Sequence, residues 1–249
     1  MLVFGAFIIL ATATLAVKES RRAAMRRNAA DWTLDGLGLL VQGIGIPVLQ
    51  TTLVYALFVL LLPQAKGLLD LHPTLAFLLN FVVVDYLYYW NHRLLHGRTF
   101  WQTHAVHHSA EHLDLFITSR NTLWTSLLIV YVWVNGFFIF LLREPQSYIL
   151  AASLTASLDL WRHTAFGLKA NSRFYRLLAP LFITPHEHAW HHSSTKSVCN
   201  FGANLSLWDR LHGTYYSPGE LPSKLGIATP LSLPRKLFFP FTRKEGLLR

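Results

Sequence analysis

The chain has 249 residues, a length that fits a single domain and leaves no room for a second large one. Hydrophobic residues make up 52% and charged residues only 14%, whereas about 25% is usual in soluble proteins, so the composition argues against a soluble fold and for an integral membrane protein. The formal net charge of +9 would also suit a nucleic-acid partner, but membrane proteins concentrate Lys and Arg on their cytoplasmic side, and we expect no nucleic acid.

The N-terminal quarter is predicted to contain two apolar crossings. Residues 2–17 are apolar and precede a basic run at residues 18–27. A signal peptide carries its positive charge before the apolar region, so this order predicts a transmembrane helix with its C-terminal end in the cytoplasm. Residues 37–62 are again apolar, and Pro47 within them predicts a kinked helix that crosses outward.

Three further apolar stretches follow a short outer loop at residues 63–73. Residues 75–90 are predicted to cross back inward. This stretch ends in aromatic residues suited to the headgroup layer: Tyr86, Tyr88, Tyr89 and Trp90. Residues 123–142 then go outward and residues 147–161 return. The alternative is that this pair forms a re-entrant hairpin, because the returning segment is short for a full span. Together these stretches predict an all-α integral membrane bundle of about four or five transmembrane helices.

The C-terminal third is predicted to lie in the cytoplasm. Residues 217–249 are rich in prolines and basic residues and predict an extended basic tail without a core of its own. Residues 75–216 then form the core of one domain that covers the whole chain. In this topology Lys66 and Arg143 lie on the outer side and every other Lys and Arg lies on the inner side, which supports the orientation.

Histidines cluster in two segments that this topology places on the cytoplasmic side. Residues 90–112 hold six of the thirteen histidines, and residues 186–192 hold four more. Each segment contains an H-x-x-H-H pattern, and the first also contains an H-x-x-x-H pair. On a helix these offsets bring side chains to one face. Two clusters of this form predict a cap that binds more than one metal ion.

Nine histidines are candidate metal ligands. They are His92, His96, His104, His107, His108, His163, His188, His191 and His192. Imidazole suits iron, zinc, copper and nickel, and the single cysteine, Cys199, argues against a cysteine-based site. One tetrahedral zinc takes four ligands, so nine histidines predict two metal ions. Asp85, Glu111 and Asp159 are carboxylates that we expect to orient the rings or to offset the metal charge.

The remaining histidines are weaker candidates. His72, His112 and His212 stand outside the spacing pattern, and we expect them not to be ligands. His186 also falls outside the H-x-x-H-H spacing, and its role stays open.

Two other kinds of protein also carry clustered histidines. His108, Glu111 and His112 match H-x-x-E-H, the inverted zinc-peptidase motif, which binds one zinc and uses the glutamate as general base. That alternative leaves the other histidines unexplained. A membrane metal-binding or metal-transport protein is the second alternative. Transport requires polar residues at bilayer depth along a path, whereas these histidines gather at one face.

The three histidine patterns and their flanks resemble the fatty acid hydroxylase superfamily, the membrane-bound sterol desaturase and hydroxylase group. Its three histidine boxes correspond to residues 92–96, 104–108 and 188–192, and the resemblance extends over residues 82–215. His163-Thr164 is similar to an extra histidine found between the second and third boxes in the alkylglycerol monooxygenase-like branch.

The resemblance implies a di-iron centre held by the nine histidines, with zinc as a substitute metal. It places Asp85, Glu111, Asn200 and Asp209 beside the ligands. It further implies that dioxygen is the co-substrate and that a C–H bond of a sterol, fatty acyl or alkyl lipid is oxidised to an alcohol or an alkene. His163 and Glu111 favour hydroxylation, because they look closest to the monooxygenase-like branch.

The same resemblance sets expectations for partners and location. Electrons are expected to come from a separate electron-donor protein, and the lipid substrate is expected to enter from the bilayer. We expect a multi-pass protein of the bacterial inner membrane, with the endoplasmic reticulum as the alternative, and with the histidines and the C-terminus on the cytoplasmic side.

Overall fold

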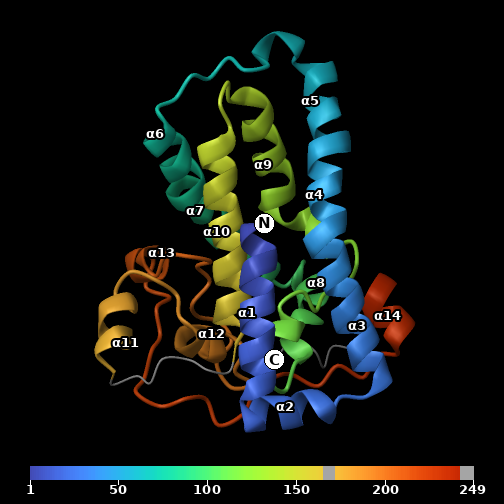
Figure 1. The fold of residues 1–249 in the computed structure, drawn as a ribbon. Helices are drawn as coiled ribbons and strands as arrows, with labels where there is room; N and C mark the ends of the chain where they lie inside the picture. The colour runs from blue at the N-terminus through green and yellow to red at the C-terminus, as the bar shows by residue number, and fades with distance from the viewer. Residues whose placement is uncertain (165–171, 242–249) are drawn as a thin grey trace.

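The computed structural model describes residues 1–164 and 172–241, and the regular structure in that part of the chain is helical (Figure 1). Pairing of extended segments there is limited to three isolated bridges. The predicted all-α architecture is therefore confirmed. Figure 1 shows an upper bundle of long helices and a lower cap of short helices and irregular segments, into which several bundle helices continue.

One long helix runs through the bundle and into the cap. It comprises α3 (Ala29–Leu40), α4 (Ile46–Leu49) and α5 (Tyr55–Leu61), joined by π-helical turns at Val41–Gly45 and Gln50–Val54. The 33-residue helix is about 50 Å long, more than the roughly 30 Å of a bilayer core. Among the described residues, it is the one unbent helix long and apolar enough to cross a membrane. Pro47 lacks an N–H, and the helix continues past it through the π-helical turns.

The N-terminal segment is sharply bent. α1 (Leu2–Ala16) and α2 (Lys18–Met25) meet at 95°, and only the two together have the length and apolarity of a membrane span. With 15 residues, α1 alone is about 22 Å long, less than the bilayer core. It contacts α10 (Gln146–Arg162) and lies at the level of the cap (Figure 1). The first crossing predicted at residues 2–17 is thus not seen as a separate straight span.

A continuous helix leads from the loop at residues 62–72 to the cap. It comprises α6 (Pro73–Leu78), a π-helical turn (Leu79–Val84) and α7 (Asp85–Leu95). It continues beyond the predicted end at residue 90 and carries the first histidine pattern. The prediction of a headgroup-facing aromatic group is wrong for Tyr89, which is fully buried. Its hydroxyl lies 2.9 Å from Thr214 Oγ1. The Tyr89 and His212 rings stack with their centroids 5.1 Å apart.

The helical hairpin formed by α9 (Val130–Leu141) and α10 completes the bundle. The prediction that α9 begins at residue 123 is wrong, because residues 123–129 form turns that include a 3-10 helix at Thr125–Leu128. Buried polar side chains explain the difference. Thr125 Oγ1 donates to the Thr103 carbonyl at 3.0 Å, which ties this segment to the cap. A buried apolar cluster joins α6, α9 and α10: Ala76, Val84, Leu142 and Tyr148.

Short helices form the cap below the bundle: α8 (Trp101–His104), α11 (Arg173–Leu178), α12 (Pro185–His191), α13 (Leu207–Leu211) and α14 (Leu233–Phe238). The described part of the tail, residues 217–241, differs from the predicted coreless extension. Leu237 of α14 is buried against Leu34 and Val106. The Leu123 N–H donates to the Leu237 carbonyl at 3.0 Å, so the tail is fastened to the cap.

Candidate metal centre

The first two histidine patterns lie where the chain leaves α7. The last turns of α7 place His92 and His96 on one face, one turn apart. The second pattern is divided between α8 (Trp101–His104) and a 3-10 helix at His107–Ser109. The three histidines of that pattern therefore do not share one helix face, and they point to two different places.

The third pattern lies on α12, whose start is fixed by a capping box. The Thr184 side chain accepts a hydrogen bond from the first turn, and the Thr184 N–H donates to Glu187 Oε2 at 3.0 Å. Glu187 is fully buried and was not predicted as part of the site. The Thr-x-x-Glu spacing is a capping-box signature, so the sequence could have identified Glu187 as the residue that fixes the start of α12.

The nine candidate histidines come together in two groups. One group is His92, His96, His104, His108 and His191, and the other is His107, His163, His188 and His192. Within each group, one nitrogen from every ring lies within 4.8 Å of the others. All of these side chains are buried except that of His96, which is partly buried. The groups adjoin each other, since the rings of His108 and His192 stack at 4.5 Å.

In the four-histidine group, the facing Nε2 atoms of His107 and His163 carry lone pairs rather than protons. A backbone carbonyl only accepts hydrogen bonds, so an imidazole whose Nδ1 lies against one carries its proton there. His163 Nδ1 donates to the Asp159 carbonyl at 2.8 Å, and His107 Nδ1 donates to the Arg120 carbonyl at 3.3 Å. Their Nε2 atoms are 3.5 Å apart, and two neutral rings protonated in this way cannot share a hydrogen bond. A cation between them satisfies both.

The five-histidine group follows the same rule. His92 Nδ1 donates to the Phe201 carbonyl at 2.8 Å, and His191 Nδ1 donates to the Cys199 carbonyl at 2.7 Å. Both rings therefore present Nε2 as a lone pair to the interior of the group. The buried Nε2 atoms of three rings have no hydrogen-bond partner among the described residues: His96, His108 and His191. Buried polar atoms without partners indicate a missing ligand.

The spacing of the nitrogens fits metal ions. His188 Nε2 lies 2.9 Å from His163 Nε2 and 3.1 Å from His192 Nε2. His92 Nε2 lies 3.0 Å from His104 Nε2. Two imidazole nitrogens bound to one ion at about 2.0–2.1 Å are about 2.9–3.4 Å apart at ordinary bond angles. Each group therefore has the donor set and the spacing for one ion.

Burial keeps these imidazoles in the neutral form that binds metals. Desolvation, followed by electrostatic interaction with the neighbouring histidines, lowers the pKa well below the usual range for five of them: His104, His107, His108, His188 and His192. Desolvation likewise lowers the pKa of His191 to about 4. A protonated imidazole has no lone pair for a metal, so the lowered pKa values preserve the ligand form near neutral pH.

Asn200 fixes the two carbonyls that orient the five-histidine group. It is the one non-glycine residue with positive φ among the described residues, at 53°. Its amide donates to the Glu187 and Tyr216 carbonyls at 2.8 and 2.7 Å, and it accepts the Tyr216 N–H at 2.8 Å. The residues on either side of it, Cys199 and Phe201, supply the carbonyls that receive the two Nδ1 protons.

Asp209 supports the same loop from behind. Its carboxylate accepts the N–H groups of Phe201 and Gly202 at 2.7 Å each. Burial raises the pKa of Asp209, and the hydrogen bonds from Thr214 and these N–H groups oppose the rise. Asp85 is also buried and accepts the N–H groups of Asn204 and Leu205 at 2.8 and 3.1 Å. Both carboxylates act through the 200–205 loop, and neither contacts a histidine of the groups directly.

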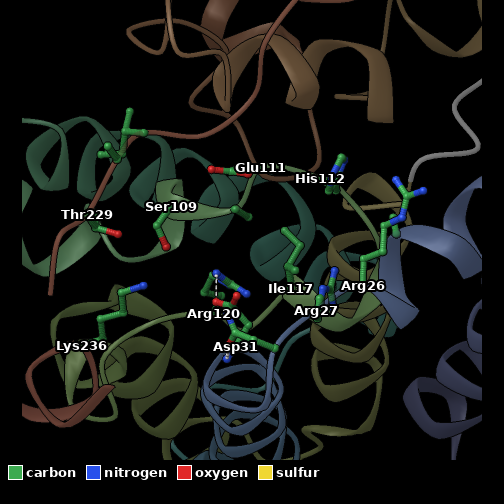
Figure 2. Close-up of a pocket in the computed structure, with 15 residues that line it drawn as sticks. Arg26, Arg27, Asp31, Ser109, Glu111, His112, Ile117, Arg120, Thr229 and Lys236 are labelled. Carbon is green, nitrogen blue, oxygen red and sulfur yellow. Dashed lines mark hydrogen bonds and ion pairs between the residues drawn. The ribbon is translucent and has the colours of Figure 1, made fainter. Parts of the chain in front are cut away.

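The structure places Glu111 away from the histidine groups. Glu111 is exposed and lines a pocket of about 460 Å³ together with Ser109, His112 and Lys236 (Figure 2). Neither Glu111 nor His112 joins a metal-binding group in the described part of the chain. The H-x-x-E-H alternative needs two histidines on one zinc, but His108 is buried in the five-histidine group while His112 is exposed.

A buried ion-pair network holds the segment that follows the second pattern. Arg120 Nε and Nη2 donate to the two carboxylate oxygens of Asp35 at 2.7 and 2.9 Å, and Nη1 donates to Asp31 at 3.0 Å. Arg27 pairs with Asp35 at 3.3 Å and also contacts Asp114. Because the Arg120 carbonyl receives the Nδ1 proton of His107, this network connects α3 to the four-histidine group.

The other histidines have separate roles. His186 Nε2 donates to the Pro218 carbonyl at 2.7 Å and lies outside both groups. His72 Nδ1 accepts the Thr74 N–H at the start of α6. His212 stacks on Tyr86 and Tyr89.

Comparison with known proteins identifies the family. The sequence profile of the family described as Fatty acid hydroxylase matches residues 77–214, more than half of the chain. An ornithine lipid hydroxylase of Rhizobium tropici is 32% identical over 177 residues, which cover 67% of this chain and 50% of that protein. The alkylglycerol monooxygenases of Xenopus tropicalis and Homo sapiens are 28% and 29% identical, over 66% and 56% of this chain and 34% and 30% of theirs.

The chain spans half or less of the length of these relatives. No solved structure matches it. The profile match contains all nine histidines of the two groups. The chain belongs to the fatty acid hydroxylase family.

Proposed function

We propose that the protein is a dioxygen-dependent lipid hydroxylase in which each histidine group holds one iron ion. The observation that carries the proposal is the convergence of nine imidazoles into two adjoining groups, in which the Nε2 atoms either have no partner or face the Nε2 atom of another imidazole. Iron bound there supplies the redox chemistry that activates dioxygen, which zinc lacks. Backbone carbonyls hold four of the rings in one tautomer. The cap keeps water away from the site, because nearly all of the ligand side chains are buried.

The proposed reaction is balanced with two electrons from outside. A lipid C–H bond, dioxygen, two electrons and two protons give a lipid alcohol and water. A separate electron-donor protein supplies the electrons in this proposal. The relatives named above are hydroxylases and monooxygenases, which supports hydroxylation over desaturation. The same names support an alkyl or an amino-acid-linked lipid as the substrate class.

The proposed location is a multi-pass position in a bacterial inner membrane, with the cap in the cytoplasm. The long helix Ala29–Leu61 supports membrane insertion. The distribution of Lys and Arg supports the orientation, because among the residues that the structure describes only Lys66 and Arg143 fall at the end opposite the cap (Figure 1).

The grouping of the histidines disfavours metal transport. A transport path requires ligands spaced along a route through the bilayer. Here the rings form two groups at one end of the bundle, and four of the rings are held there by backbone carbonyls: His92, His107, His163 and His191.

The proposal is tested by following oxygen into lipid. Purified, iron-loaded protein in vesicles of bacterial lipids would receive an electron donor and dioxygen labelled with oxygen-18, and lipid extracts would be analysed by mass spectrometry. We expect one labelled oxygen atom per modified lipid. His188→Ala should abolish the product, whereas the matched variant His112→Ala should retain it, because His112 is exposed and belongs to neither group. Unmodified lipid in the presence of bound iron, or label arising only from water, would contradict the proposal.

A further inference from the structure

A short C-terminal segment bridges the two histidine groups through their backbones. The Gly226 N–H donates to the His192 carbonyl at 3.0 Å, and the Ile227 N–H donates to the His108 carbonyl at 2.9 Å. His108 belongs to the five-histidine group and His192 to the four-histidine group. Two successive N–H groups therefore hold one ligand segment from each group. We call residues 224–227 the strap.

The strap is held in register on both sides. The Ser194 N–H donates to the Lys224 carbonyl at 3.1 Å, and Ser193 and Leu225 form an antiparallel bridge. The Leu225 side chain packs on a buried cluster that includes residues from both the second and the third histidine segments: Ala110, Leu113, Ile117 and Ala189. The strap is therefore packed against both the second and the third histidine segments.

Gly226 allows the strap to approach this closely. Its φ is +77°, a conformation that favours glycine, and it is buried. A Cβ added there would lie 2.6 Å from the Ala110 carbonyl oxygen and 3.1 Å from the Glu111 nitrogen. Those are backbone atoms of the segment that follows His108. Any other residue would push the strap and the second histidine segment apart.

We propose that the strap, with Gly226 as its positioning residue, sets the spacing between the two metal ions. The strap lies outside residues 77–214, the part of the chain that matches the family profile. The proposal rests on the two-metal centre described above and adds the element that fixes its geometry. A displaced strap leaves every histidine present but changes how His108 and His192 stand relative to each other.

The test compares Gly226→Ala with Gly213→Ala. Gly213 also has positive φ, at +70°, but a Cβ there would meet nothing within 4 Å. Both variants place a β-carbon at positive φ, and only Gly226→Ala adds the clash. In iron-loaded, detergent-purified full chain, we expect Gly213→Ala to keep two spin-coupled irons. Gly226→Ala should lose at least half of the coupled Mössbauer signal. Equal coupled signals in the two variants would overturn the proposal.

Hydrogen exchange of the unaltered protein gives a second test that needs no variant. Metal binding should slow exchange of the strap amides, because the carbonyls of His108 and His192 become fixed. The Gly226 and Ile227 amides should exchange at least tenfold more slowly with metal than without it. Unchanged exchange at both amides would overturn the proposal. If the unaltered protein does not bind two metal ions, the proposed function is wrong. If it binds two metal ions but the strap amides exchange at the same rate with and without metal, only the strap proposal is wrong.

Discussion

His191 in the cap is buried, and its Nδ1 donates to the Cys199 carbonyl. Burial of this neutral ring makes the stability of the metal-free protein sensitive to acid. The folded-state pKa of His191 is about 4, below the ordinary value of 6.5. Between these pH values the unfolded chain binds protons that the folded chain does not, so the free energy of unfolding falls as pH decreases. We expect the thermal midpoint of the metal-free protein to be constant above about pH 7 and to drop from pH 6.5 to pH 4. A midpoint unchanged over that interval would contradict the burial of neutral rings.

Asn200 offers a second test at the level of a single side chain. Asn200→Ala removes three hydrogen bonds of a buried side chain and puts alanine, which tolerates positive φ less well than asparagine, at φ 53°, so it should cost about 3 kcal/mol or more of stability. It should also lower the iron content, because the carbonyls that orient His92 and His191 lose their support. Chemical unfolding and elemental analysis measure both effects. Asn28→Ala removes an exposed helix cap and should leave the iron content unchanged.

Among the elements, α3 has a role that its apolar sequence did not suggest. Asp35 is completely buried and neutralises Arg27 and Arg120, whereas Asp31 is 28% exposed. Asp35→Asn leaves two buried guanidinium groups without their shared carboxylate and should cost about 3–5 kcal/mol. Asp31→Asn should cost less than about 1 kcal/mol. Thermal unfolding of the two variants measures the difference. Equal, small losses would show that the network does not hold the Arg120 segment.

The histidine patterns were sufficient to predict which residues gather, because offsets of three and four residues are set by helix geometry. They could not predict how the second pattern divides between the groups. In both H-x-x-H-H patterns the histidines four residues apart share one group, and the histidine between them, His107 or His191, belongs to the other group. The carbonyls of Cys199 and Phe201 were also beyond prediction, since every residue has a carbonyl and only the fold selects these two.

Apolar composition was a less reliable guide to the helices. It predicted a helix at residues 37–62, where the structure has the longer helix Ala29–Leu61. It also predicted that α9 begins at residue 123, but buried hydroxyl groups favour turns over residues 123–129. It also treated Tyr89 as a headgroup residue, although a tyrosine with a buried partner for its hydroxyl packs equally well inside a cap. For Glu111, closeness in sequence to His108 was a poor guide. Its carboxylate is exposed and belongs to neither histidine group.

At the scale of the whole molecule, the orientation in the membrane is testable with single cysteines. The native Cys199 is buried, so an added cysteine should dominate labelling by a membrane-impermeant maleimide. We expect Lys66→Cys, in the outer loop, to react in intact cells. Lys224→Cys, in the cap, should react only after the membrane is opened, because the positive-inside rule places the cap in the cytoplasm. The reverse pattern would contradict the proposed orientation.

The metal content of the purified full chain tests the central claim most directly, by elemental analysis together with Mössbauer spectroscopy on iron-enriched material. Two irons per chain with spin coupling, and loss of the coupled signal in His107→Ala, are the predicted result. Two zinc ions would leave the ligand groups standing but not the oxygen chemistry. One zinc and no iron, in protein produced with ample iron, would contradict the two-metal hydroxylase.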